Sequence, residues 1–275
     1  MPRHTTAGRR EHLARLVAER GFLRVTDAGL LLGVSEVTVR SDLTALEVDR
    51  RLMRVHGGAM PHFQLRLEPT LEQALSLDAG TKRAIGERAA ALVEPGQSVI
   101  LDVGSTALAV AEALVRRVEL KDVAIITNGL SIALALEAAL PRFTVVVTGG
   151  TLRPLQHSLV NPNASSFFDS IHADIAFIGC NGIDPVNGVT NINFPEAEVK
   201  RRMLQASTRH VLVADGSKFG QVHLGVIGTV GDFQQLITGG AMPAGVVDAM
   251  RARGVHVVLA DAASGANSAS GAAIG

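Results

Sequence analysis

The chain has 275 residues, of which 47% are hydrophobic, and its 26 basic and 26 acidic side chains cancel at neutral pH. This length and composition predict a globular protein with one large and one small domain. The single cysteine, Cys180, excludes an intramolecular disulfide and a cysteine-cluster metal site, and we expect it to be a small buried apolar side chain. The absence of Trp and Tyr argues against an aromatic platform for single-stranded nucleic acid.

The sequence contains no predicted membrane span. Its longest apolar stretch, Val123 to Leu140, is interrupted by Asn128 and Glu137 and falls short of the ~20 apolar residues that a spanning helix needs. No apolar run precedes Leu13, so we predict no secretory signal and expect a cytoplasmic protein. Residues 262–275 are almost entirely Ala, Ser, Gly and Asn, which is typical of a disordered tail.

Three short helices are predicted near the N-terminus. Residues 11–19 carry apolar side chains at helical spacing, and residues 26–32 form a second helix that Gly33 ends. Ser35 can cap a third helix within Val34 to Glu47, because its hydroxyl can accept a backbone N–H of the first turn. Two helices, a tight turn and a third helix are the helix-turn-helix arrangement.

The third helix has one buried and one free face. Its apolar stripe consists of Val39, Leu43 and Leu46, and its free face carries side chains that can meet base edges and phosphates, namely Val37, Arg40, Ser41 and Thr44. From Met1 to Gly57 there are ten Arg, no Lys and seven acids, a net charge of +3, so the other 218 residues carry −3. This asymmetry has the sign that phosphate binding requires, although a small helical domain with a solvated Arg-rich face is the alternative.

The sequence VSEVTVRSDLTALE at 34–47, followed by RVHGGA at 54–59, resembles the N-terminal domain of the DeoR-type transcriptional regulators. The chain departs from the family pattern at Ala28 and Gly29, where Leu-Ala is usual, and at Arg50, where Gly is usual. The resemblance implies a winged helix-turn-helix over residues 1–60 that binds double-stranded operator DNA. The predicted DNA-binding residues are Ser35, Val37, Thr38, Arg40, Ser41 and Thr44, with Arg54 and His56 in or just after the wing.

From about Leu75 onward, short β-branched apolar runs alternate with amphipathic segments. We expect strands at 99–101, 123–126, 144–147, 175–178, 211–213 and 255–259, and helices at 81–92, 107–117, 131–139, 196–207 and 243–253. This alternation predicts a Rossmann-like open, mostly parallel α/β sheet over residues 76–261. Residues 61–75 are predicted to be a linker or arm, since Pro61 and Pro69 interrupt any helix there.

Ligands of such sheets bind beyond the carboxyl ends of the strands. Gly104, Ser105 and Thr106 follow the first strand and open a helix, where backbone N–H groups and the helix dipole can bind a phosphate. The alternative is that Ser105 or Thr106 is only an N-cap. The other predicted strand ends are also small and polar, with Asp102, Thr127, Asn128, Thr148, Gly149, Gly150, Gly179, Asn181, Gly182, Asp184, Asp215, Gly216, Ser217 and Lys218.

Several common motifs are missing. The chain has no Walker motif and no Gly-x-Gly-x-x-Gly at the first strand-helix unit, which disfavours nucleotide binding. Its histidines His157, His172, His210 and His223 lack metal-ligand spacing, so we predict no metal and no cofactor.

The second half of the chain carries a further resemblance. Asp215 to Gly220 is similar to the Asp-x-Ser-Lys-Phe-Gly segment of the DeoR effector domain, and the region also resembles ribose-5-phosphate isomerase. The latter resemblance implies that Lys82 and the Gly104 to Thr106 loop hold a phosphate, while the sugar is surrounded by Asn181 to Asp184, Glu196 and Lys218. Two features depart from the enzyme pattern: Asn181 replaces its first Asp, and 188–195 lack its glycine-rich segment with a second Lys. An amide keeps hydrogen bonds but removes a titratable group, which favours binding over turnover.

These observations predict a regulator that is not an enzyme: a DNA-binding repressor, acting as a homo-oligomer, whose operator affinity is controlled by a phosphorylated sugar or related metabolite. The first alternative is a sugar-phosphate isomerase or deaminase with an accessory N-terminal helical domain. The second is a DNA-binding protein whose large domain serves only oligomerisation. The predicted effector-binding residues are Lys82, Asp102, Gly104, Ser105, Thr106, Thr127, Asn128, Gly149, Gly150, Asn181, Gly182, Asp184, Glu196 and Lys218.

Overall fold

The computed structural model describes residues 6–20, 23–49, 51–55, 57–61, 68–161 and 163–260. The chain divides into two compact units, residues 1–67 and 68–275. Residues 68–75, which the sequence placed in a linker, belong to the second unit, and helix α4 (Leu71–Ser76) begins among them. The predicted tail at 262–275 lies outside the described residues.

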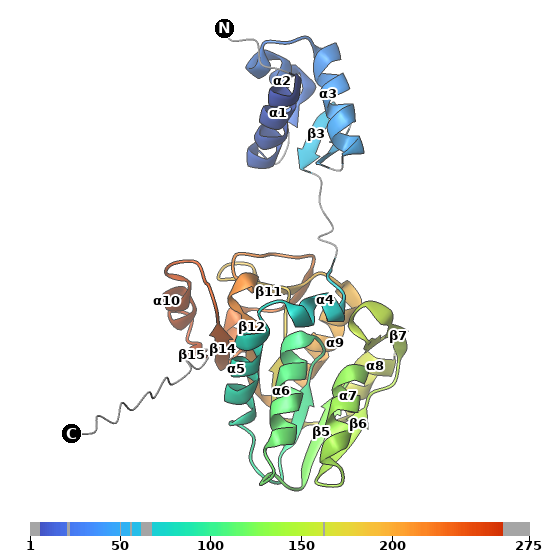
Figure 1. Cartoon of the computed structure of the whole chain (residues 1–275), viewed down its shortest axis with the longest axis vertical. Helices are drawn as coiled ribbons and strands as arrows, with labels where there is room; N and C mark the ends of the chain where they lie inside the picture. The colour runs from blue at the N-terminus through green and yellow to red at the C-terminus, as the bar shows by residue number, and fades with distance from the viewer. Residues whose placement is uncertain are drawn as a thin grey trace, which may run out of the picture. The chain divides into compact units, whose positions relative to one another are not determined.

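The first unit is the predicted winged helix-turn-helix (Figure 1). Its helices are α1 (Thr6–Arg20), α2 (Val25–Leu32) and α3 (Glu36–Val48). A three-stranded antiparallel sheet, ordered β1-β3-β2, is formed by β1 (Leu23–Arg24), β2 (Leu52–Val55) and β3 (Gly58–Pro61). Leu13 of α1, Leu43 of α3 and Leu52 of β2 are fully buried in one core, so the three helices and the wing form one packed body.

The turn between α2 and α3 depends on a close backbone approach. Gly33 ends α2 in the left-handed conformation with φ 66°, and Ser35 caps α3 by accepting the Thr38 N–H at 3.3 Å. A Cβ on Gly29 would lie 3.0 Å from the Val34 carbonyl oxygen, whose residue also bonds back to Gly29 through its N–H. A Cβ at position 29 would therefore require the Val34 carbonyl to shift by a few tenths of an ångström.

Asp42 ties the third helix to the first. Its buried carboxylate accepts from Arg9 Nε at 2.6 Å and from Arg10 Nε at 2.9 Å, both on α1. Burial alone raises the pKa of Asp42, but the two guanidinium groups outweigh it and hold that pKa below its ordinary value. The carboxylate thus holds α3 against α1.

We expect Asp42→Asn to destabilise the first unit by about 1.5–3 kcal/mol at pH 7, because charged hydrogen bonds of this kind contribute that much. The folded pKa is lowered, so this stabilisation is present above the unfolded value of about 3.9 and is lost as pH falls through the folded pKa. Hydrogen exchange of the α1 and α3 amides should be faster in Asp42→Asn than in the wild type at pH 7, and the two rates should approach each other in acid. Asp49→Asn, at an exposed position after the same helix, is the control; equal protection in both variants would contradict the prediction.

The second unit is built on a seven-stranded sheet in which every pairing is parallel. Its order is β15-β14-β12-β9-β4-β5-β6. The strands are β4 (Ser98–Leu101), β5 (Val123–Thr127), β6 (Phe143–Val147), β9 (Ala173–Ile178), β12 (Ser207–Asp215), β14 (Gln235–Gly239) and β15 (His256–Leu259).

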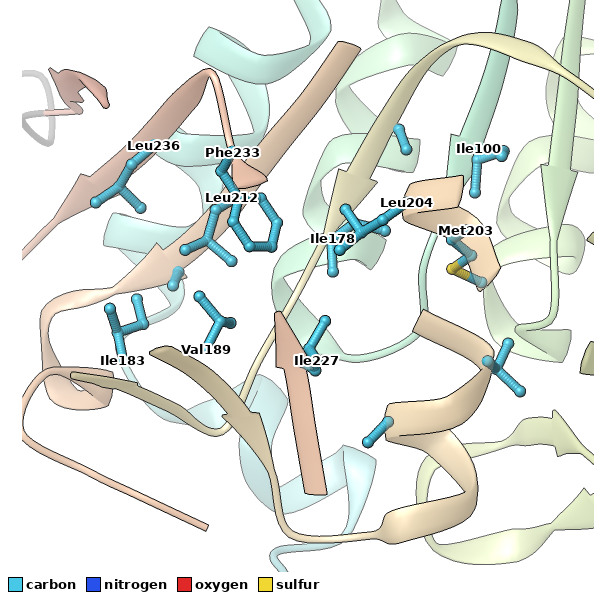
Figure 2. Packing of buried hydrophobic residues seen from close by; sticks show 14 of the residues in the cluster. Ile100, Ile178, Ile183, Val189, Met203, Leu204, Leu212, Ile227, Phe233 and Leu236 are labelled. Carbon is cyan, nitrogen blue, oxygen red and sulfur yellow. The ribbon is translucent and has the colours of Figure 1, made fainter. Parts of the chain in front are cut away.

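Helices cover both faces of this sheet (Figure 1). One face carries α5 (Ala79–Ala90), α6 (Ser105–Arg116) and α7 (Leu130–Leu136), and the other α8 (Asn163–Phe167), α9 (Phe194–Gln205) and α10 (Val246–Arg251). Alternate strand residues supply the two cores, because Val99 and Leu101 pack toward α6 whereas Ile100 packs toward α9. Figure 2 shows the second of these cores, with Ile100, Ile178 and Met203 among its side chains.

Six strands and five helices (α5, α6, α7, α9 and α10) of this α/β domain lie where the sequence predicted them, whereas α4 and α8 were not predicted. Six further strands were not predicted either. They are β14, the antiparallel sheet of β10 (Gly182–Asp184), β11 (Gly188–Asn191) and β13 (Gly225–Gly228), and the hairpin of β7 (Thr151–Arg153) and β8 (Ser158–Val160). Except for β14 these strands have three or four residues each, too few to show a two-residue period. No helix of the described residues is long and apolar enough to cross a membrane.

Candidate functional site

The free face of α3 is exposed as predicted from its periodicity. Val37 is 76% exposed, and Arg40, Ser41 and Thr44 are exposed beside it. Ser35 is exposed at the N-cap, and its hydroxyl lies 3.0 Å from the half-buried Thr38 hydroxyl. These residues form one polar strip with a single apolar side chain, although their contact with DNA stays a prediction.

The wing is joined to this helix by Arg54. The guanidinium of Arg54, on β2, donates to Thr44 Oγ1 at 2.8 Å, and its backbone N–H donates to Glu47 Oε1 at 3.0 Å. Arg54 therefore continues the surface of α3 rather than lying apart from it. His56 lies outside the described residues.

In the second unit a pocket lies at the carboxyl ends of the central strands, where the sequence predicted one. Six of the predicted effector residues line it: Gly104, Ser105, Thr106, Asn181, Glu196 and Lys218. Gly104 has φ 105°, a conformation that favours glycine, and it places Ser105 at the start of α6. Because the first N–H groups of a helix have no acceptor within it, they are available to a ligand there. Lys218 follows β12, with Nζ 3.8 Å from Asp215 Oδ2.

Behind the pocket lies a buried ion pair between Asp102, after β4, and Lys200 of α9. The Asp102 carboxylate also accepts the Gly179 N–H at 2.8 Å, and Lys200 Nζ donates to the Gly179 carbonyl at 3.3 Å. Burial raises the pKa of Asp102, with Lys200 acting in the opposite direction. Two strands and one helix are joined at this point.

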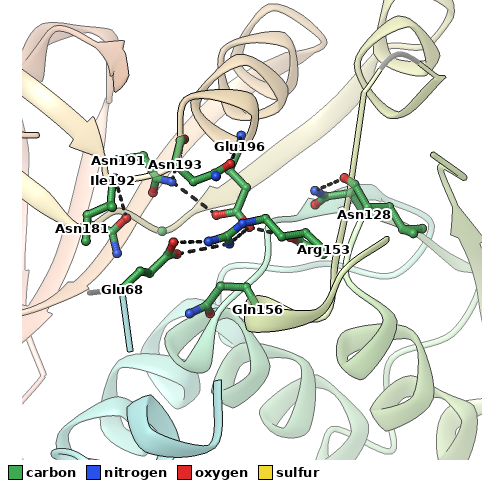
Figure 3. Close-up of polar contacts among 12 residues, drawn as sticks. Glu68, Asn128, Arg153, Gln156, Asn181, Asn191, Ile192, Asn193 and Glu196 are labelled. Atoms are coloured by element: carbon green, nitrogen blue, oxygen red, sulfur yellow. Dashed lines mark hydrogen bonds and ion pairs between the residues drawn. The ribbon is translucent and has the colours of Figure 1, made fainter. Parts of the chain in front are cut away.

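Arg153 is shared by two carboxylates that line the pocket, Glu68 and Glu196 (Figure 3). Its Nη1 lies 2.7 Å from Glu196 Oε1, and its Nη2 contacts Glu68 Oε2. Glu196 also accepts a hydrogen bond from the Ser158 hydroxyl and a 3.3 Å hydrogen bond from Asn191 Nδ2. Glu196 is therefore fixed on several sides.

Some predicted effector residues do not line this pocket. Lys82 is buried on α5, where its ammonium donates to the carbonyls of Ala74 and Leu77 and lies 3.9 Å from Asp215 Oδ2. Burial lowers the pKa of Lys82, against the effect of Asp215. Lys82 thus holds the end of α4, and Ala74 of that helix lines the pocket.

The remaining predicted positions serve the surrounding loops. Asp102 lies behind the pocket, and Thr127 Oγ1 accepts the Gly129 N–H. Asn128 lies away from the Arg153 cluster in Figure 3 and donates to the Leu159 carbonyl at 2.9 Å. Four further predicted effector residues also lie outside the pocket lining. Gly149 and Gly150 lie in the turn before β7, and Gly182 and Asp184 lie in the β10–β11 hairpin. There Asp184 accepts two backbone N–H groups of its own turn.

Among side chains that carry a polar group or a thiol, sequence reasoning missed six in or beside the pocket: Glu68, Arg153, Gln156, Cys180, Asn191 and Lys200. Only Lys200 carried a usable signal, since it follows Glu196 by one helical turn. Burial raises the pKa of the Cys180 thiol to about 12, so this side chain is a neutral thiol at physiological pH. Among the described residues, no group of three His, Cys, Asp or Glu side chains is placed to hold a metal ion.

Asn181, the predicted counterpart of the first aspartate of ribose-5-phosphate isomerase, already accepts a hydrogen bond within the protein. Asn181 Oδ1 accepts the Ile192 N–H at 2.9 Å, so this side chain orders the strand that leads into α9. An amide has no proton to exchange at neutral pH. The pocket offers hydrogen bonds and charges, while Glu196, its candidate base, is bound to three partners.

A winged helix-turn-helix joined to an α/β domain with a polar pocket defines a DNA-binding transcriptional regulator with a sensor domain. Residues 9–61 match the DeoR-like helix-turn-helix domain, and residues 78–240 match the DeoR C terminal sensor domain. The chain belongs to the DeoR family.

Relatives that are named as transcriptional regulators or repressors align along nearly the whole chain. The HTH-type transcriptional regulator GlpR of Haloferax volcanii is 34% identical over 92% of this chain and 97% of its own length. The HTH-type transcriptional repressor CsqR of Escherichia coli is 31% identical over 91% and 94%. The glycerol-3-phosphate regulon repressor of Haemophilus influenzae is 30% identical over 91% and 96%. Among solved structures, ribose 5-phosphate isomerase from Plasmodium falciparum is 20% identical, with a TM-score of 0.38, over 52% of this chain and 53% of its own.

Removing one partner of the Lys200–Asp102 pair should lower the free energy of unfolding far more than removing both partners. We expect Asp102→Asn to destabilise the second unit by about 3–5 kcal/mol, since it leaves a buried ammonium without a counter-charge. Adding Lys200→Met to that variant should restore part of the loss, and urea unfolding followed by circular dichroism measures both. Strictly additive effects of the two substitutions would show that the charges do not compensate each other.

Proposed function

We propose that this protein is a repressor whose operator affinity is set by a phosphorylated sugar or a related phosphorylated metabolite bound in the sensor pocket. The observation that carries the proposal is the convergence of the α6 N-terminus and Lys218 in one polar pocket. The N–H groups of a helix start and an ammonium group are the partners that a phosphate group favours.

The rest of the pocket suits a polyhydroxylated ligand. Gln156, Asn181 and Asn191 line it with side-chain amides, and each amide offers both donors and acceptors. We assign the phosphate to the end formed by Ser105 and Lys218, and the sugar hydroxyls to the amides. The glycerol-3-phosphate regulon repressor among the relatives is named for a phosphorylated metabolite, which agrees with this ligand class.

We assign DNA recognition to the surface of α3 and the wing, with Arg40 and Arg54 as its cations. A single unit of this size makes few base contacts, so we infer a homo-oligomer that places two units on two half-sites. The effector changes DNA binding only if the two arrangements of the protein bind it with different affinities. We infer a cytoplasmic protein, because a regulator must share a compartment with the DNA that it binds.

Two variants should separate the two activities. We expect Lys218→Met to weaken binding of sugar phosphates by roughly 10–100-fold, the value of one charged hydrogen bond, while leaving operator affinity unchanged. Arg40→Ala should weaken operator binding by about 1–3 kcal/mol and leave effector binding intact. Thermal shift with a sugar-phosphate panel and fluorescence anisotropy with the gene's own upstream DNA measure the two, and Lys121→Met, at an exposed position, is the control.

Parallel loss of both activities in both variants would refute this division of labour. If no sugar phosphate stabilises the wild-type protein, the large domain serves oligomerisation alone.

The isomerase alternative predicts a different result. With Asn181 in place of a carboxylate and Glu196 bound to Arg153, we expect no conversion of ribose 5-phosphate above the buffer background. Isomerisation can be followed by the absorbance of the ketose product. A turnover number within the ordinary enzyme range of about 1–10³ s⁻¹ would overturn the sensor assignment.

A further inference from the structure

The free face of α3 has an exposed valine at each end. Val37 is 76% exposed and Val48 is 77% exposed. At 100° per residue the two positions differ by only about 20° around the helix, and the exposed Ser41 and Thr44 lie between them on the same face. The surface that faces away from the core of this unit is therefore polar along its middle and apolar at its two ends.

The polar side chains of this face are bonded within the unit. Thr44 Oγ1 donates to the Arg40 carbonyl at 2.8 Å and accepts from Arg54 Nη1 at 2.8 Å. Arg40 Nη2 lies 3.4 Å from Glu36 Oε2. To read a base by hydrogen bonds, these groups must exchange partners that they already have. Val37 has no hydrogen bond to give up, because its side chain carries neither a donor nor an acceptor.

The two valines differ in their surroundings. The wing lies against the C-terminal half of α3, where Arg54 bonds to Thr44 and its backbone N–H donates to the Glu47 carboxylate at 3.0 Å. Val37 is the second residue of α3, in the first turn after the Ser35 cap. Helix-turn-helix proteins contact base edges with the N-terminal residues of this helix. Val37 is therefore the valine that is placed to meet a base.

The chemistry of the major groove limits what a valine can recognise there. Its base edges consist mainly of hydrogen-bond donors and acceptors, and the C5-methyl group of thymine is the apolar group among them. A valine placed against a donor or an acceptor removes water from that group and gives no bond in return. Against a methyl group it buries apolar surface on both sides. The favoured partner of Val37 in the groove is thus a thymine.

We propose that Val37 contacts the C5-methyl group of a thymine in the major groove, and so selects a T·A base pair at one position of each operator half-site. This inference rests on the proposed function and adds the base that one residue reads. It concerns the DNA-binding unit alone.

Uracil in place of thymine tests the contact, because it removes the methyl group and keeps every hydrogen-bonding group of the base. The full-length protein is mixed with its gene's own upstream DNA in which uracil replaces thymine at random. Bound and free DNA are then cleaved at uracil and compared. For the wild type we expect uracil at one position of each half-site to weaken binding by about fourfold, which corresponds to the burial of one methyl-sized group.

Two valine variants show which residue makes the contact. Val37→Ala should bind the thymine operator about fourfold more weakly than the wild type, and uracil at the same position should no longer matter. Val48→Ala is the matched control, with the same residue type, helix face and exposure, and it should keep the wild-type uracil pattern. Alanine favours helix more than valine does, so both variants should keep α3 folded.

The remaining outcomes separate this inference from the proposal on which it rests. The thymine contact is overturned if every uracil effect persists in Val37→Ala, or if it is Val48→Ala that abolishes one. Weaker operator binding by Arg40→Ala would then still support DNA recognition by α3. If neither Arg40→Ala nor Val37→Ala weakens operator binding, the assignment of recognition to α3 and the thymine contact both fail.

Discussion

The buried pair of Lys200 and Asp102 is the constraint on which the pocket depends. Each wall of the pocket leaves from it by a short path along the chain: Gly104 follows Asp102 by two residues, Asn181 follows the bonded Gly179 by two, and Glu196 precedes Lys200 by one helical turn. A charge pair taken out of water tolerates little displacement, because either ion alone would be strongly destabilising. The ligand-facing loops therefore take their positions from this buried contact.

Pocket residues that follow predicted strands could be found from the sequence. Pocket residues that reach the site through tertiary contacts could not. Gly104, Asn181 and Lys218 were found because parallel strands bring their carboxyl ends to one edge, whatever the side chains are. Glu68 lies in a segment assigned to a linker, and Arg153 in a hairpin too short to show a period, so nothing local indicated either residue. Lys82 illustrates the remaining limit, since a matching residue type did not fix the direction of its ammonium group, which bonds to α4 instead.

The DNA-binding unit was easier to predict because its order is local. The spacing of Val39, Leu43 and Leu46 alone determined which face of α3 is buried, and the cap at Ser35 determined where the helix begins. What the pattern could not give is the bond from Arg54 to Thr44, which joins wing and helix into one surface.

The sensor pocket contains the only sulfhydryl group of the chain, and its pKa of about 12 leaves almost no thiolate at cellular pH. Peroxides and disulfides react with thiolates, so Cys180 will be a poor target for both. Because Cys180 lines the pocket, oxidation of a more reactive thiol at this position would obstruct ligand binding. The low acidity of this one thiol therefore leaves the pocket with little redox reactivity of its own.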